Sequence, residues 1–186
     1  MTQSAESSTS EALRHALTIE AKKLIVNSTY AGQGHLEESS RWSWWDSWLG
    51  VPATLGTTLL AAGASVSALL DAQPLVTATI ALLATACSTI RVFFKTEDLT
   101  QSHGLKGNQY LSLRNEARIF KNLELLSAHN GEELQAHLKD LWQRYNALNE
   151  LPPLRYSRHS YEAAKRNIAA GEQDYENDPL WKEHGD

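Results

Sequence analysis

Two long stretches of the sequence carry no charged side chain and no histidine. They cover residues 47–70 and 72–90, and Asp71 is the only residue between them. An α-helix rises about 1.5 Å per residue, so about 20 residues cross the ~30 Å hydrocarbon layer of a bilayer. The junction at 71–74 is short and polar and ends in a proline, which is typical of a tight connection. The pattern therefore predicts an antiparallel helical hairpin of membrane-spanning length.

Charged and aromatic residues flank these stretches as a bilayer requires. Arg41 precedes the first stretch, and Arg91 and Lys95 follow the second. The positive-inside rule then places both termini in the cytoplasm. Asp46 lies among aromatic rings and needs water, Arg41 or a neighbouring subunit as its partner. Tryptophan favours the headgroup region, where its ring is apolar and its N–H stays hydrated. The predicted membrane-interface residues are Trp42, Trp44, Trp45, Trp48, Phe93 and Phe94.

The alternative is a soluble bundle that buries the hairpin at its centre. Both stretches are rich in alanine, threonine, serine and glycine, which weakens a purely hydrophobic argument for a membrane. A fully buried helix of this length, however, needs more apolar surface around it than the flanking amphipathic helices offer. The formal net charge of −5 also argues against a general nucleic-acid binder. We therefore favour the membrane hairpin.

The remainder of the chain predicts amphipathic helices and no strands. Asn130 with Glu133 forms a capping box, Pro152 and Pro153 end a helix, and Gly171 closes the last one. The fold class expected is all-α, with a transmembrane hairpin between an N-terminal cytoplasmic helix and a C-terminal cytoplasmic helical region. The expected segments are a flexible N-terminus at 1–10, one domain at 11–175 and a tail at 176–186. Within the domain we expect cytoplasmic helices at 11–32, 99–128, 131–149 and 160–170, and membrane helices at about 48–70 and 74–93.

Small and hydroxyl-bearing residues recur at helical spacing within the hairpin. Such residues let helices approach closely in lipid, and their hydroxyls bond to a neighbouring backbone or line a narrow pore. A single two-helix hairpin cannot enclose a channel, so either role involves a homo-oligomer. Plain helix packing and pore lining both remain open. The candidates are Thr54, Thr58, Ala61 and Ser65 on the first helix and Thr77, Ala81, Ala84 and Ser88 on the second.

Catalytic and metal-binding motifs are not expected in this chain. Gly32 and Gly34 form a GxG turn rather than a phosphate loop, and the histidines lack metal-ligand spacing. The single cysteine, Cys87, is expected to be a packing residue. We predict no catalytic residue, no cofactor, no metal and no enzymatic activity.

The order of these features resembles the SLATT domain family of prokaryotic two-transmembrane effectors. The resemblance covers about residues 11–175. It includes the segment 91–118, RVFFKTEDLTQSHGLKGNQYLSLRNEAR, and the closing segment 151–174, LPPLRYSRHSYEAAKRNIAAGEQD. In that family the helix after the second membrane segment carries a histidine, a small residue, an aromatic residue and then charged residues. The matching positions here are His103, Gly107, Tyr110, Arg114 and Glu116.

The resemblance implies a pore-forming effector of an antiviral defence system. Such a protein would oligomerise in the inner membrane, permeabilise it and cause abortive infection. The implied trigger is a separate sensor or signal-producing partner, such as a nucleotidyltransferase, a SLOG-type protein or a reverse transcriptase. Candidates for gating or ligand contact are His103, Tyr110, Arg114 and Arg118. The alternative is a non-conducting membrane adaptor that scaffolds a cytoplasmic partner.

Overall fold

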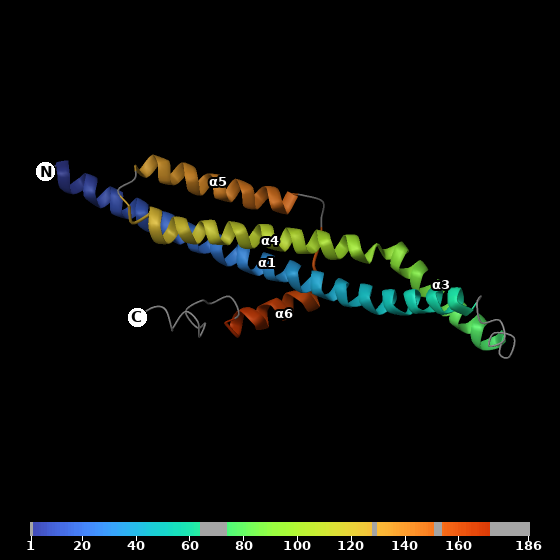
Figure 1. Cartoon of the computed structure of the whole chain (residues 1–186). Helices are drawn as coiled ribbons and strands as arrows, with labels where there is room; N and C mark the ends of the chain where they lie inside the picture. The colour runs from blue at the N-terminus through green and yellow to red at the C-terminus, as the bar shows by residue number, and fades with distance from the viewer. Residues whose placement is uncertain (1, 64–73, 128–129, 151–153, 172–186) are drawn as a thin grey trace, which may run out of the picture. The chain divides into compact units, whose positions relative to one another are not determined.

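The computed structural model describes residues 2–63, 74–127, 130–150 and 154–171, and most of these residues are helical (Figure 1). No strand occurs within these four ranges, so the all-α prediction is confirmed for them. The elements are α1 (Thr2–Gly63), α3 (Pro74–Phe94), α4 (Thr96–Ile119), the π-helical turn η1 (Phe120–Glu124), α5 (Gly131–Glu150) and α6 (Arg158–Ala169).

Helix α1 differs most from the sequence-based expectation. It begins inside the segment predicted to be flexible, and it continues from Thr2 to Gly63 without ending at the glycines near residue 32. Those glycines serve packing instead. A Cβ at Gly32 would lie 2.9 Å from Leu111 Cδ2, and a Cβ at Gly34 would lie 3.0 Å from the Tyr156 ring. A glycine inside a helix costs about 1 kcal/mol relative to alanine, and close approach of a neighbour is the usual reason for keeping it.

Proline 52 also has a different position from the one expected. A membrane helix that begins near residue 48, as expected from the sequence, would have Pro52 in its opening turns, where its missing N–H costs least. In the structure Pro52 lies inside α1, because the predicted cytoplasmic and membrane helices are one continuous helix. The bounds of α3, α5 and α6 agree closely with prediction, each within about two residues of the expected positions. The helix expected at 99–128 differs more: α4 begins at Thr96 and ends at Ile119, where the π-helical turn η1 follows.

The described chain forms two compact units. The first comprises residues 1–38 and 103–186, and the second comprises residues 39–102. The hydrophobic core of the first unit is built from α1, α4, η1 with the residue that follows it, and α5. Its buried members are Leu17, Ala21, Leu24, Leu113, Ala117, Phe120, Leu125, Leu134, Leu138 and Leu141.

Helix α6 attaches to α1 through two adjacent glutamates. Glu38 Oε2 accepts hydrogen bonds from Ser157 N at 2.9 Å and from Ser160 Oγ at 2.7 Å. Asn167 Nδ2 donates to Glu37 Oε1 at 2.7 Å. Ser157 also caps α6 by accepting from Ser160 N at 3.2 Å. Gly171, with φ of 85°, follows α6 as predicted from the preference of left-handed positions for glycine.

The second unit pairs the end of α1 with α3 in antiparallel fashion. Asp46 of α1 bonds Arg91, and Gly56, further along α1, meets Ala84, which comes earlier in α3. A Cβ at Gly56 would lie only 2.5 Å from Ala84 Cβ, so the two helices touch through their smallest side chains. Lys95, with φ of 47°, separates α3 from α4.

This contact predicts opposite effects for two glycine-to-alanine changes on α1. Gly50→Ala should stabilise the protein slightly, by up to about 1 kcal/mol, because its Cβ would meet only the Arg91 guanidinium, at 3.5 Å. Gly56→Ala should destabilise it, because the added methyl group forces α1 and α3 apart. Thermal unfolding of the detergent-solubilised protein, followed by circular dichroism, measures both. Equal behaviour of the two variants would contradict the close contact.

Candidate functional site

An exposed apolar surface covers the paired helices of the second unit. In α3, Leu75, Leu82 and Phe93 are 83%, 71% and 79% exposed. A segment from Leu75 to Glu124 contains a window with a mean hydropathy of 1.7, and 6% of that window is buried. Within the described residues this is one helix whose length and composition suit a membrane crossing. The predicted first membrane helix extends past Gly63 into residues outside the described ranges.

The low burial distinguishes this helix from the core helix of a soluble bundle. A core helix of equal hydropathy would be mostly covered by its neighbours, whereas large contiguous apolar patches on a protein surface mark sites of interaction. The exposure of the tryptophans also differs from that expected in the core of a soluble bundle. Trp44, Trp45 and Trp48 are each about half exposed, and the Trp44 ring lies 5.2 Å and 5.5 Å from the other two ring centroids. The Arg41 guanidinium lies 5.4 Å from the Trp42 ring centroid.

A polar anchor ties α1 to α3 beside these aromatic residues. Arg91 Nε donates to Asp46 Oδ1 at 2.7 Å, and Arg91 Nη2 donates to Asp46 Oδ2 at 2.9 Å. The Thr96 hydroxyl also donates to Asp46 Oδ1. This two-point pairing is the strong geometry for an arginine and a carboxylate. Asp46 therefore pairs with Arg91 of the same chain. The partners expected from the sequence were water, Arg41 or a neighbouring subunit.

The anchor fixes which aromatic residues share one end of the helix pair. Asp46 lies within the tryptophan cluster, and Arg91 lies next to the exposed pair Phe93 and Phe94. The two phenylalanine rings are perpendicular, at a centroid separation of 5.2 Å. The predicted interface residues thus lie near the polar end of the pair.

The predicted small-residue stripes occupy two different environments. On α3, Ala84 packs against Gly56, and Thr77, Ala81 and Ser88 are half-buried on the same helical face. On α1, Thr54 and Thr58 are exposed, and the Thr58 hydroxyl donates to Thr54 O at 2.8 Å. Exposed hydroxyls on α3 also bond their own helix, as Thr85 does to Ala81 O at 2.8 Å. The side chains of Ala61 and Ser65 lie outside the described residues.

The gating candidates lie in the first unit. His103, Tyr110 and Arg114 are buried on one face of α4, and Arg118 is half-buried. The Tyr110 hydroxyl donates to Asn149 Oδ1 at 2.8 Å. Burial raises the Tyr110 pKa to about 12, since desolvation penalises the phenolate. Arg114 donates from Nε and Nη2 to Asn115 Oδ1 at 3.2 and 3.0 Å.

Two partners of this buried cluster come from α1 and were not singled out from the sequence. His35 places its Nδ1 2.9 Å from His103 Nδ1 and stacks on Tyr110, with ring centroids 5.8 Å apart. Glu38, also buried, accepts bonds from the start of α6. Burial, reinforced by His103 and Lys106, lowers the His35 pKa to about 4. Both residues lie beyond residue 32, where the first helix was expected to end, so the sequence analysis did not place them on a helical face.

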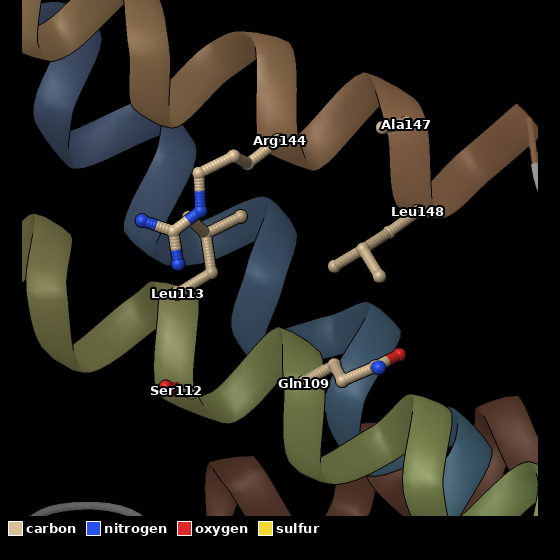
Figure 2. A pocket seen from close by; sticks show the side chains of 6 residues that line it. All are labelled: Gln109, Ser112, Leu113, Arg144, Ala147 and Leu148. Atoms are coloured by element: carbon tan, nitrogen blue, oxygen red, sulfur yellow. The ribbon is translucent and has the colours of Figure 1, made fainter.

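A cavity of about 380 Å³ lies between α4 and α5. Figure 2 shows Gln109, Ser112 and Leu113 of α4 facing Arg144, Ala147 and Leu148 of α5. The one charged group in the lining, Arg144, already donates from Nη2 to Glu116 Oε1 at 2.8 Å, and this bond lowers the Glu116 pKa. The lining therefore offers no free charge for an ionic ligand. Among the described residues no cluster of three or more metal-ligating side chains occurs.

Comparison with protein-family models, curated proteins and solved structures gave no match. The SLATT resemblance therefore stays a prediction based on the sequence, and no family is assigned to the chain. The class of protein that the structure itself defines is an all-helical chain with one long, exposed apolar helix.

The polar anchor predicts an energetic coupling between Asp46 and Arg91. Unfolding free energies of Asp46→Asn, Arg91→Gln and the double variant should give a coupling of about 1 kcal/mol, the upper range for partly exposed pairs. The exposed pair of Arg158 and Glu162, with Nε and Oε1 2.9 Å apart, is the matched control. Its coupling should be near 0.3 kcal/mol. An Asp46–Arg91 coupling no larger than that of the control would contradict the anchor.

The buried tyrosine gives a separate prediction about the first unit. Tyr110→Phe leaves Asn149 Oδ1 without its donor and should lower the free energy of unfolding by about 1 kcal/mol. Tyr161→Phe, at a more exposed ring, should change it by less than about 0.5 kcal/mol. Denaturant titration followed by circular dichroism measures both. Equal losses would show that the hydrogen bond does not stabilise the fold.

Proposed function

We propose that this chain is a membrane-inserted effector that assembles into a pore. The observation that carries the proposal is the exposed apolar surface of the α1–α3 pair. One end of the pair holds the aromatic residues and the Asp46–Arg91 bond, and the rest of its described length carries no charged residue. A bilayer satisfies this surface because lipid chains cover the apolar residues, while the anchor and the indole N–H groups stay at the headgroups. The pair would cross the inner membrane twice, with both termini in the cytoplasm.

Assembly is part of the proposal because one antiparallel pair has no lumen. Ala84 packs directly on Gly56, so the interior of the pair is filled. A conducting path would then run between copies of the chain. The exposed hydroxyl face of α1, which carries Thr54 and Thr58, is the candidate for lining it. By the family resemblance, conduction would depolarise the host membrane in abortive infection after a sensor protein or nucleotide signal acts on the cytoplasmic helices.

A non-conducting membrane adaptor is the second candidate. One observation favours it: the hydroxyls of Thr58, Thr79, Thr85 and Thr89 each donate to a carbonyl of their own helix, at 2.8 Å. Hydroxyls bonded in this way need no water, so they fit a lipid-facing helix as well as a pore. In that case the hairpin would be an anchor, and the first unit would recruit a cytoplasmic partner.

Dye release from liposomes distinguishes the two candidates. The purified protein, reconstituted in phosphatidylethanolamine and phosphatidylglycerol vesicles and added together with a candidate partner, should release an entrapped dye. Thr58→Leu should reduce the rate about tenfold or more if this face lines the path, because the hydroxyl is replaced by a hydrocarbon group. Thr85→Leu on α3 is the matched control, since its threonine is also exposed and bonded to its own helix.

The outcomes separate the candidates as follows. Release that Thr58→Leu suppresses and Thr85→Leu leaves intact supports the pore and its lining. Full insertion without release, in the presence of every partner tried, supports the adaptor. Recovery of the protein in the soluble fraction without detergent contradicts both.

A further inference from the structure

Two buried histidines join α1 to α4 in the first unit. His35 and His103 are 3% and 2% exposed, and their Nδ1 atoms lie 2.9 Å apart. Neither the proposed pore nor the hydrophobic core requires an imidazole pair at this position. A core position of this size is ordinarily filled by apolar residues, which need no hydrogen-bonding partner.

The contact tolerates only certain protonation states. At a separation of 2.9 Å one Nδ1 must carry the hydrogen and the other must accept it. The pair can therefore be neutral, or it can hold a single extra proton. When both rings are protonated, both Nδ1 atoms carry hydrogens, and two positive charges meet without an acceptor between them. The hydrogen bond then becomes a repulsion.

The net effect of the surroundings on His35 is to disfavour its charged form. Groups that face His35 include Lys106 on α4, Glu38 on α1, Tyr110 on α4 and Tyr156 in the segment before α6. Burial, His103 and Lys106 each lower the His35 pKa. The Glu38 carboxylate attracts the charged ring and acts in the opposite direction, but the other effects outweigh it. The two tyrosines contact His35 through their rings.

The two helices approach closely near the histidines. A Cβ at Gly107 would lie 3.0 Å from Gly32 O, and a Cβ at Gly32 would lie 3.2 Å from Gly107 O. The backbones of α1 and α4 are therefore nearly in contact there. Close-packed interiors resist gradual deformation, so repulsion between the buried rings acts against this helix contact.

We propose that His35 and His103 form a proton-sensitive latch between α1 and α4, closed while the pair shares at most one proton and opened when both rings are protonated. The latch is a property of the first unit and does not depend on membrane insertion. Its consequence for activity, that acidification of the cytoplasm favours the activated state, rests on the proposed function.

The direction of the pH dependence follows from the His35 pKa. Its value is about 4 in the folded protein, below the 6.5 usual for a histidine side chain. Above pH 6.5 the ring is neutral whether the contact is closed or open, so the stability of the contact is fully present. Between 6.5 and about 4 the open state binds the additional proton, and the stability of the contact falls as the pH falls.

Hydrogen exchange of the detergent-solubilised full chain at about pH 7.5 and pH 5 tests the latch. After correction for the intrinsic exchange rate, protection of amides around residues 30–38 and 103–110 should fall roughly tenfold or more at the lower pH. Amides of α5 around residues 134–145 serve as the internal reference. His35→Phe, which keeps an apolar ring on Tyr110, and His35→Gln, which keeps a polar group, should both abolish the selective loss. His159→Asn, at an exposed histidine of α6, should retain it.

Two results would overturn the latch. One is equal corrected protection at both pH values in the unmodified protein. The other is a selective loss that persists in whichever His35 variant folds, which would assign the effect to Glu38 or another group. Dye release at the two pH values is recorded separately. Selective opening without any release would leave the latch in place and contradict only the proposed pore.

Discussion

The apolar surface of the α1–α3 pair is the constraint on which the account depends. Most large side chains of α3 are exposed, and few residues of its most apolar window are buried within the chain. Covering apolar area is favourable by about 25 cal/mol per Å², so this surface favours an apolar environment over water. The proposed bilayer would supply that environment without requiring a specific protein partner, and it suits the absence of charged residues in α3 before Arg91.

The two units differ in their chemistry. In the second unit, the polar end of the helix pair holds Asp46 against Arg91 beside exposed aromatic rings. In the first unit, an ordinary hydrophobic core is combined with buried polar groups on α1 and α4. Buried polar groups are costly unless every partner is present, so they specify one arrangement of the helices more than they stabilise it. These groups are therefore sensitive to protonation, whereas the core is not.

Much of the fold could be predicted from the sequence where local signals decide it. The bounds of α3, α5 and α6 follow from the apolar stretch, the Asn130 cap and Gly171. The continuity of α1 could not be predicted, because glycines such as Gly32 and Gly34 favour the end of a helix by local preference. Here both lie inside α1, and their lack of a side chain allows close contacts with α4 and Tyr156. The partner of Asp46 was also missed. An antiparallel hairpin with its turn near 71–74 would place Asp46 opposite about residue 99 rather than Arg91, so the spacing alone did not give this partner. The pairing of His35 with His103 needs the register of α1 on α4, which residue patterns do not provide.

Depth-dependent quenching of tryptophan fluorescence tests the membrane placement most directly. A Trp142→Phe, Trp181→Phe variant keeps only the four tryptophans near Asp46, and it is reconstituted in vesicles whose lipids carry bromine atoms at different depths. The account predicts strong quenching by lipids brominated close to the headgroup, weaker quenching by lipids brominated near the chain ends, and little quenching by aqueous iodide. Fluorescence that no brominated lipid quenches, or that iodide quenches fully, would place the four rings outside the bilayer and contradict the account.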